Sequence, residues 1–116
     1  MSCTTCTPLI SEKDLQHETE IYEESHDFAD ILLCPSCNKL FLQYWVEIYD
    51  DGWFYFTPLE AGEKEFLLES TRNPGAQSAI IKLIRTKTEV YCRHPLSPSP
   101  LRLKEGKHCL LEGAPW

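Results

Sequence analysis

The sequence lacks the apolar stretch that a membrane span requires, and its first residues lack the pattern of a signal peptide. No apolar run approaches the ~20 residues that cross a bilayer, and no basic segment is followed by an apolar stretch and a small-residue cleavage site. We therefore expect a cytoplasmic protein that does not bind membranes. In a reducing compartment, the six cysteines are expected to be metal ligands or redox groups rather than disulfides.

The sequence also lacks the motifs of several enzyme classes. It contains no Gly-rich phosphate loop, no GxSxG nucleophile elbow and no HExxH metal-binding helix. Carboxylates are so frequent in the first part of the chain that adjacent pairs, such as Glu23 with Glu24, arise by chance. We interpret these pairs, and Asp50 with Asp51, as solvated turn and edge charges. The absences predict a protein that is not an enzyme.

Basic residues are scarce in the first part of the chain. Residues 1–70 hold fifteen Asp or Glu against three Lys, whereas residues 71–116 hold eight Lys or Arg against three Glu. The net charge is −7, so most of the surface cannot gain binding free energy by neutralising nucleic-acid phosphates. We therefore do not expect nucleic acid as the partner. The favoured interpretation is that the basic half packs against the acidic half. The alternative is that the basic residues from Lys82 to Lys107 bind nucleic acid or another acidic ligand.

Length and composition predict one folded domain. A chain of 116 residues has no room for two independently stable cores, and its 42% apolar and 25% charged content is close to the globular average. We expect a single domain over residues 1–116. Its core is predicted at 3–57, a helical cover at 58–87, and short strands with an irregular tail at 88–116.

Two CxxC pairs dominate the chemistry that is present. The first is CTTC near the start of the chain and the second is CPSC, and 27 residues lie between the two pairs. Two residues between ligands let both sulfurs of a tight turn reach one metal ion at ~2.3 Å, and two such turns complete a tetrahedron. The sequence therefore predicts a Zn²⁺ site whose ligands are Cys3, Cys6, Cys34 and Cys37. Because sulfur fills all four positions, this site would be structural rather than catalytic.

The residues around the second pair suit a metal-binding turn. Pro35 fixes the backbone just after the first cysteine of the pair. Asn38 follows the last cysteine, at a position where a left-handed residue is usual and Asn is the best substitute for Gly. Lys39 adds a cation close to a complex whose four thiolates would leave a net charge of about −2.

These residues carry a resemblance to a known family. CTTC, a strand-like segment, CPSCNK and a hairpin together resemble the zinc-ribbon family, whose second knuckle often reads CPxCGK. The likeness covers residues 3–57. The chain is also similar to small bacterial zinc-ribbon proteins in which a CPxCG knuckle runs into an aromatic strand, an acidic turn and a helix. The resemblance implies a ribbon fold and a zinc ion, but ribbons serve nucleic-acid enzymes, adaptors and protein-binding modules alike.

Two other interpretations of the cysteines remain open. One is that all four are reduced thiols without a metal. The other is that the CPSC sequence from Cys34 to Cys37 is a redox dithiol, which resembles the CPxC of glutaredoxin-like thiol–disulfide oxidoreductases. Such an enzyme carries a helix directly after the motif, because a helix N-terminus activates the attacking thiol. The strand-like sequence after Cys37 does not predict that helix.

A second group of potential metal ligands lies in the last part of the chain: Cys92, His94, His108 and Cys109. Adjacent His108 and Cys109 would point to opposite faces of a strand, so they are poor partners on one metal. We interpret Cys92 and Cys109 as small buried apolar residues. His17 and His26 lie in the acidic stretch and are expected to be solvated.

Several segments have the composition of strands. In LQHETEIYEE, the spacing of Leu15, Glu18 and Tyr22 suggests a helix, whereas the alternation around Ile21 suggests a strand, and we favour a strand over Thr19–Glu24. DFADILL predicts a buried strand after a charged turn at residues 25–27. TEVYCRH and LRL predict short strands near the end of the chain, and CLLE is a further candidate. The aromatic and β-branched run KLFLQYWVEIYDDGWFYF predicts a hairpin with Asp51 and Gly52 in its turn.

The proposed turn assigns a register and two faces to this hairpin. It pairs Tyr49 with Phe54 and Glu47 with Phe56. One face carries apolar side chains, namely Leu40, Leu42, Val46, Ile48, Trp53 and Tyr55. The other face is aromatic and carries Phe41, Trp45, Tyr49, Phe54 and Phe56. We expect the aromatic face to be core beneath the helices, and the alternative is an exposed patch for a protein partner.

Two helices are predicted after the hairpin. Thr57 as N-cap, Pro58 at the first position and Glu60 as a capping carboxylate predict a helix to about Ser70, and the apolar repeat in AQSAIIKLIRTK predicts another over 76–87. The predicted fold class is α+β, a zinc ribbon with an antiparallel hairpin sheet packed by two helices. We expect a non-enzymatic module that binds another protein, either as an adaptor or as an inhibitor similar to the immunity proteins that neutralise toxins.

Overall fold

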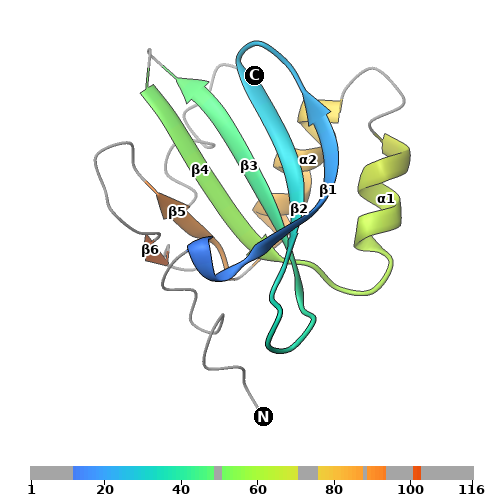
Figure 1. Ribbon diagram of the computed structural model, residues 1–116. Helices are drawn as coiled ribbons and strands as arrows, with labels where there is room; N and C mark the ends of the chain where they lie inside the picture. Colours follow the sequence, from blue (N-terminus) through green and yellow to red (C-terminus); the bar gives the residue numbers. More distant parts are fainter. Residues whose placement is uncertain (1–11, 49–50, 71–75, 88, 94–100, 103–116) are drawn as a thin grey trace.

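The computed structural model describes residues 12–48, 51–70, 76–87, 89–93 and 101–102. Within these residues, an antiparallel sheet carries two helices on one of its faces (Figure 1). A short 3₁₀ helix, η1 (Glu12–Asp14), precedes the sheet. The strands are β1 (Gln16–Glu23), β2 (Asp27–Leu33), β3 (Leu40–Ile48), β4 (Asp51–Pro58), β5 (Tyr91–Arg93) and β6 (Leu101–Arg102), and the helices are α1 (Glu63–Ser70) and α2 (Ala76–Thr86).

The sheet follows the order of the chain. Its strands lie in the order β1-β2-β3-β4-β5-β6, and each pairs antiparallel with the next. The α+β class with a hairpin sheet and two helices is confirmed, and so are the strands predicted at Thr19–Glu24 and in DFADILL. Asp27 corrects one detail, because it lies buried at the start of β2 rather than in the preceding turn. Neither helix that the structure describes is both long and apolar enough to cross a membrane.

The β3–β4 hairpin forms, but the predicted register is wrong. Glu47 pairs with Gly52 instead of Phe56, and Ile48 with Asp51 is the last described pair. Asp51 and Gly52 therefore belong to β4 rather than to the turn, and positions 49–50, including Tyr49 of the predicted Tyr49–Phe54 pair, lie outside the described residues. Because the partner of Glu47 moves by an even number of residues along β4, the side chains of the described residues keep their predicted faces.

Gly52 has a packing role that explains this register. A Cβ atom on Gly52 would lie only 2.9 Å from Cε2 of the Trp45 indole. The indole is itself held by stacking on Phe28, with 5.4 Å between ring centroids. Glycine at position 52 therefore leaves room beside the hairpin pair for the largest side chain of β3.

Replacing Gly52 by alanine should lower the free energy of unfolding by about 1–3 kcal/mol, because the added methyl group displaces the Trp45 indole from Phe28. Urea unfolding followed by tryptophan fluorescence measures the change. Gly62→Ala is the control, since Gly62 has φ 88° but no neighbour within 4 Å, so it should cost about 1 kcal/mol of backbone strain and leave the fluorescence of the folded protein unchanged. An unaltered urea midpoint for Gly52→Ala would contradict this packing role.

The helices cover the face of the sheet that is rich in aliphatic residues. Its core contains Leu42, Tyr44, Val46 and Tyr55 from the hairpin, with Leu67 from α1 and Ile80, Ile81 and Ile84 from α2. This corrects the prediction that the aromatic face lies beneath the helices. Branched aliphatic side chains of α2 lie in one core cluster with those of the sheet, whereas the rings on the other face pack against one another.

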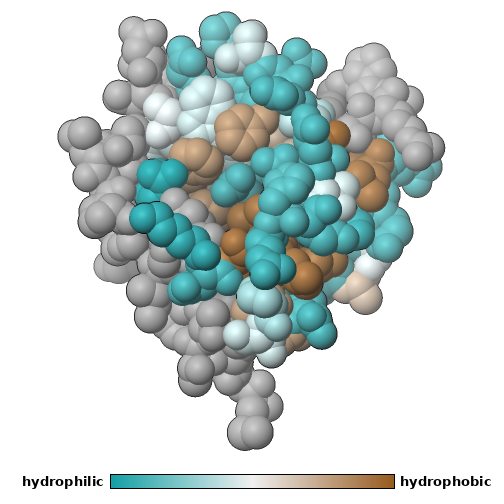
Figure 2. All heavy atoms as spheres, in the orientation of Figure 1, coloured by the Kyte–Doolittle hydropathy of each residue, from teal (hydrophilic) through white to brown (hydrophobic). Residues whose placement is uncertain are grey.

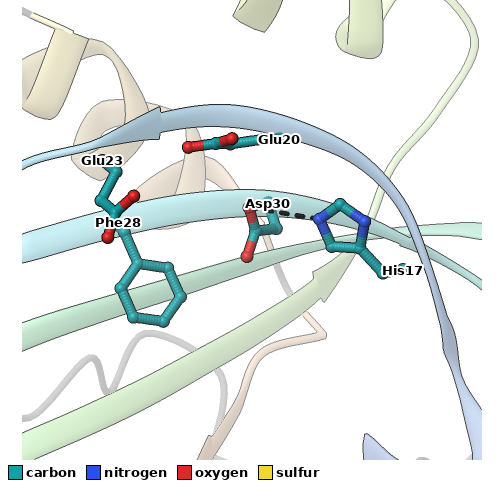
Figure 3. A pocket seen from close by; sticks show the side chains of 5 residues that line it. All are labelled: His17, Glu20, Glu23, Phe28 and Asp30. Carbon is teal, nitrogen blue, oxygen red and sulfur yellow. Dashed lines mark ion pairs between the residues drawn. The ribbon is translucent and has the colours of Figure 1, made fainter.

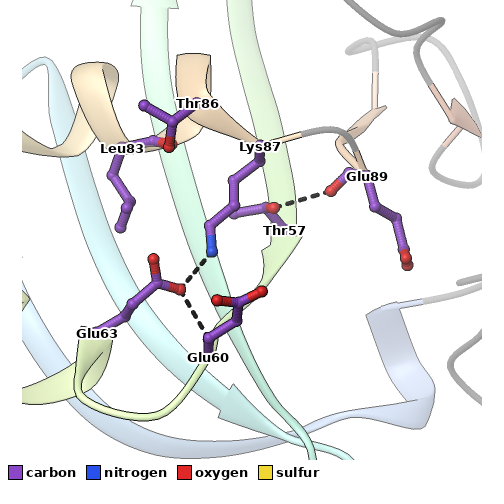
Figure 4. Close-up of polar contacts among 7 residues, drawn as sticks. All are labelled: Thr57, Glu60, Glu63, Leu83, Thr86, Lys87 and Glu89. Carbon is purple, nitrogen blue, oxygen red and sulfur yellow. Dashed lines mark hydrogen bonds and ion pairs between the residues drawn. The ribbon is translucent and has the colours of Figure 1, made fainter.

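Helix α1 begins later than predicted. Thr57 does not cap it, because Thr57 pairs with Leu42 in the sheet and its hydroxyl donates a hydrogen bond to the Glu89 carbonyl (2.8 Å; Figure 4). Pro58 likewise belongs to β4. The Glu63 carboxylate makes the capping contact instead, because it accepts a hydrogen bond from the Glu60 N–H (2.7 Å). The predicted end at Ser70 and the second predicted helix are confirmed.

Ion pairs join the helices to each other and to the sheet. Lys87, after α2, pairs with Glu63 of α1 (Figure 4), which brings a basic residue of the second half against an acidic residue of the first. Lys64 of α1 pairs with Glu18 of β1 (2.7 Å), and this ammonium group holds the pKa of Glu18 below its usual value. Surface pairs of this kind add little stability individually, but they orient α1 against the edge strand.

Candidate functional site

The CPSC sequence forms a closed turn between β2 and β3. The Cys34 N–H donates a hydrogen bond to the Lys39 carbonyl (2.9 Å), and the Asn38 N–H donates to the Cys34 carbonyl (2.8 Å). Asn38 has φ 64°, so the predicted left-handed residue is confirmed. Lys39 lies over the Phe41 ring at 5.9 Å. The backbone therefore folds both cysteines of the second pair into one tight turn at the end of the sheet.

The two cysteines of the turn have different surroundings. Cys34 is fully buried in a second apolar cluster, on the sheet face opposite the helices, and Cys37 is exposed. The other members of this cluster are Leu15, Leu32, Phe41, Phe56 and Tyr91, with Phe54 at its border. One sulfur is thus embedded in the sheet and the other lies at the surface.

The N-terminal part of the chain enters the sheet beside this turn. Gln16, the first residue of β1, pairs with Leu33, the residue before Cys34. Leu15 packs in the same apolar cluster as Cys34. Cys6 stands nine positions before Leu15, and a segment of that length spans up to about 30 Å. The topology therefore places Leu15 and Gln16 beside the second pair, and the intervening chain is long enough for Cys6 to reach it.

The donors of the turn suit zinc, although they are only half of the predicted ligand set. Thiolates are preferred zinc ligands, and a CxxC turn presents two of them to one ion. Cys3 and Cys6 lie outside the described residues. Across residues 12–48, 51–70, 76–87, 89–93 and 101–102, no group of three or more His, Cys, Asp or Glu side chains is placed to hold a metal. Cys34 and Cys37 would therefore need two ligands from elsewhere in the chain.

The surroundings of the turn differ from those of a dithiol enzyme. Strand β3, rather than a helix, follows Cys37. The thiol of Cys34, which would be the attacking group in a CPxC enzyme, has no exposed surface. The turn therefore offers neither a helix N-terminus nor an accessible first thiol.

The remaining predicted residues are placed as follows. Cys92 is buried in the core beneath the helices, as predicted. His94, His108 and Cys109 lie outside the described residues. His17 and His26 are exposed, with side-chain exposures of 58% and 78%. His17 lies 3.5 Å from the carboxylate of Asp30, and His26 lies 3.8 Å from that of Glu47.

A buried carboxylate was not predicted from the sequence. Asp27 is 6% exposed and accepts hydrogen bonds from the hydroxyl groups of Tyr44 (3.0 Å) and Tyr22. Burial raises the pKa of Tyr22 above its usual value, and the hydrogen bond to Asp27 raises it further. The cluster joins β1, β2 and β3. Its signal in the sequence was the alternation of Asp27 with Ala29 and Ile31, which assigns all three to the core face.

The sheet face opposite the helices carries a row of aromatic rings. Phe28 of β2 stacks on Trp45 of β3 (5.4 Å) and meets Phe54 of β4 edge-on (6.1 Å). The guanidinium group of Arg93 in β5 lies over Phe54 at 4.3 Å. Figure 2 shows hydrophobic side chains in the middle of this face, bordered by hydrophilic ones. All three rings are only partly buried.

A pocket of about 280 Å³ opens where this row meets β1. It is lined by His17, Glu20, Glu23, Phe28 and Asp30, and their side chains surround one hollow (Figure 3). Glu20 pairs with Asp30 across the strands, and Glu23 pairs with Phe28. The register of β1 and β2 therefore places three carboxylates around one aromatic ring.

A smaller pocket of about 210 Å³ lies near the start of α1, where Lys39, Thr57 and Lys87 face Glu60 and Glu89. Its polar groups take part in the helix cap and in the hydrogen bond of Thr57 (Figure 4).

Comparison of the chain with protein-family models, curated proteins and solved structures gives no match. Function is therefore inferred from the residues of this chain.

Proposed function

We propose that the chain is a small zinc-binding protein in which Cys3, Cys6, Cys34 and Cys37 hold one structural Zn²⁺. The protein would be a zinc-ribbon variant that acts as a non-enzymatic module for binding another protein. The ion would fasten the N-terminal segment to the turn between β2 and β3. With sulfur in all four positions, the ion has no open position for water or substrate, so it supplies rigidity rather than catalysis.

The pairing of Gln16 with Leu33 is the observation that carries this proposal. It places Gln16 next to the residue before Cys34, and the nine positions from Cys6 to Leu15 are long enough for Cys6 to reach the turn. The closed turn around Asn38 supplies the backbone that two adjacent thiolate ligands need. Two CxxC pairs within reach of each other favour a metal over unrelated thiols.

The alternative of a thiol–disulfide oxidoreductase has less support. The attacking thiol of such an enzyme must reach a substrate disulfide, and that of Cys34 is buried. A protein-binding role is supported instead by the aromatic row on the face opposite the helices. Partly exposed aromatic side chains are enriched where proteins bind one another.

Metal analysis of the purified full chain tests the proposed site. Native mass spectrometry should show one zinc ion per chain, and a chelator that removes it should abolish the near-ultraviolet circular dichroism of the aromatic residues. A metal-free protein with the same dichroism would contradict the proposal. Catalytic reduction of insulin disulfides by the metal-free protein would favour the oxidoreductase.

A further inference from the structure

We propose that the pocket at the β1–β2 edge of the sheet face opposite α1 and α2 binds the cationic side chain of a partner protein, with arginine preferred over lysine. This inference rests on the proposed protein-binding function and names the partner as a basic segment. The binding surface consists of the aromatic row Phe28, Trp45 and Phe54 together with the carboxylates of Glu20, Glu23 and Asp30.

The aromatic side of the pocket is held in place before any partner binds. Phe28 lines the pocket and stacks on Trp45, with an interplanar angle of 19°. Trp45 in turn lies against Gly52, which leaves no space for a side chain beneath the indole. A ring fixed in this way loses little side-chain entropy when a cation stacks on it.

Two of the three carboxylates of the pocket, those of Glu20 and Glu23, lack a cationic partner within the described part of the chain, whereas Asp30 pairs with His17. Glu20 and Glu23 are exposed, and there they have neither an ion pair nor a side-chain hydrogen bond. Asp30 is more buried, and its carboxylate lies 3.5 Å from both His17 and Gln43. Three acidic groups around one hollow repel one another, and an entering cation relieves this repulsion.

The irregular pairing of β1 helps to gather these groups. The register between β1 and β2 shifts between His17 and Thr19 and again between Glu20 and Tyr22. Such bulges bend and twist an edge strand and redirect its side chains. Glu20 and Glu23 consequently line the same hollow as Phe28, although they are three positions apart on a strand (Figure 3).

The same face already shows how a guanidinium group packs on its rings. Arg93 lies 4.3 Å from the centroid of Phe54, and Phe54 contacts Phe28. A partner arginine on Phe28 would repeat this arrangement and gain carboxylates that accept paired hydrogen bonds. Lysine offers a compact charge without the flat surface, so it should bind less tightly. The negative charge and the volume of about 280 Å³ favour one cationic side chain over a nucleotide.

A short fluorescein-labelled peptide that alternates glycine and arginine is the probe, with lysine and citrulline versions for comparison. Fluorescence anisotropy with the zinc-loaded full chain should give the tightest binding for arginine. The citrulline peptide, which keeps the shape without the charge, should bind at least about tenfold more weakly. Equal binding of the arginine and citrulline peptides would overturn the proposal.

Paired variants distinguish peptide binding at the pocket from non-specific attraction of the basic peptide to an acidic protein. The double variant Glu20→Gln/Glu23→Gln should weaken binding of the arginine peptide by about tenfold or more, and Phe28→Leu should remove the preference for arginine over lysine. Glu65→Gln/Glu69→Gln on exposed positions of α1 makes the same charge change in the helix layer, and its effect should stay below about twofold. Equal losses in the two double variants would show non-specific attraction and overturn the proposal.

Two further measurements distinguish this inference from the alternatives. Sedimentation equilibrium should give the same mass for the wild type and for Glu20→Gln/Glu23→Gln. A dimer that dissociates in this variant would identify a second copy as the occupant and overturn the proposal. Zinc content is measured on the same samples. Peptide binding by a chain that holds no zinc would refute the zinc site alone, whereas a zinc-loaded chain that fails to bind arginine would refute the pocket alone.

Discussion

Replacing Cys37 by serine should abolish zinc binding and unfold the sheet at room temperature. Cys37 is exposed, so without a metal its substitution would change stability by no more than about 0.5 kcal/mol. As a zinc ligand it is part of a site that contributes about 10 kcal/mol or more to folding. A domain of this size has a total stability of only about 5–15 kcal/mol. Zinc content and thermal unfolding by circular dichroism measure the two effects.

Two controls isolate the metal from the turn. Ser36→Ala changes an exposed neighbour in the same turn and should leave the zinc content at one ion per chain. Wild-type protein treated with a chelator should match Cys37→Ser in both dichroism and thermal transition. A Cys37→Ser protein that melts at the wild-type temperature would show that Cys37 is an ordinary surface residue.

Replacing Asp27 by alanine should lower the free energy of unfolding by about 2–5 kcal/mol. The carboxylate accepts hydrogen bonds from two tyrosine hydroxyl groups in the interior. Its removal takes this acceptor away from the buried hydroxyl group of Tyr44 and the half-buried hydroxyl group of Tyr22, and each such loss costs about 1–3 kcal/mol. Urea unfolding at neutral pH measures the loss.

Further variants test whether the loss comes from the hydrogen bonds. Tyr44→Phe should cost less in the Asp27→Ala background than in the wild type, and this difference is the coupling energy of a double-mutant cycle. Asp30→Ala, on the same strand, should cost less than about 1 kcal/mol, because the contacts of Asp30 are partly exposed and long. Additive effects of Asp27→Ala and Tyr44→Phe would contradict the coupled cluster.

Local patterns predicted the strands and the second helix, because burial on one face leaves a period in the sequence. The DFADILL segment and the apolar repeat from Ile80 to Ile84 both carry such a period, and they form β2 and α2. The left-handed turn residue Asn38 was also predictable, because few residue types tolerate that conformation.

Features that depend on distant contacts were not predictable from local patterns. Asp51 and Gly52 have the composition of a hairpin turn, yet Gly52 is needed within β4 to accommodate Trp45. Thr57 is a residue type that favours helix caps, yet it pairs with Leu42 in the sheet and its hydroxyl group donates a hydrogen bond to the Glu89 carbonyl. In both cases, a contact with a residue from another segment outweighs the local preference.

The face that the helices cover depends on packing between elements, which leaves no local signal. Both faces of the hairpin are apolar, and hydrophobicity alone did not separate them. The chosen face is the one whose aliphatic side chains complement Ile80 and Ile84 of α2. The aromatic row consequently lies opposite the helices, beside the acidic edge of β1. The candidate pocket thus depends on a packing choice that composition does not specify.

X-ray absorption at the zinc edge of the purified, zinc-loaded chain tests the central claim most directly, because it reports which atoms surround the ion. The proposed site of Cys3, Cys6, Cys34 and Cys37 predicts a shell of four sulfur atoms at about 2.3 Å. A shell containing nitrogen or oxygen at about 2.0 Å would contradict the four-cysteine site, and so would a chain that retains no zinc after purification.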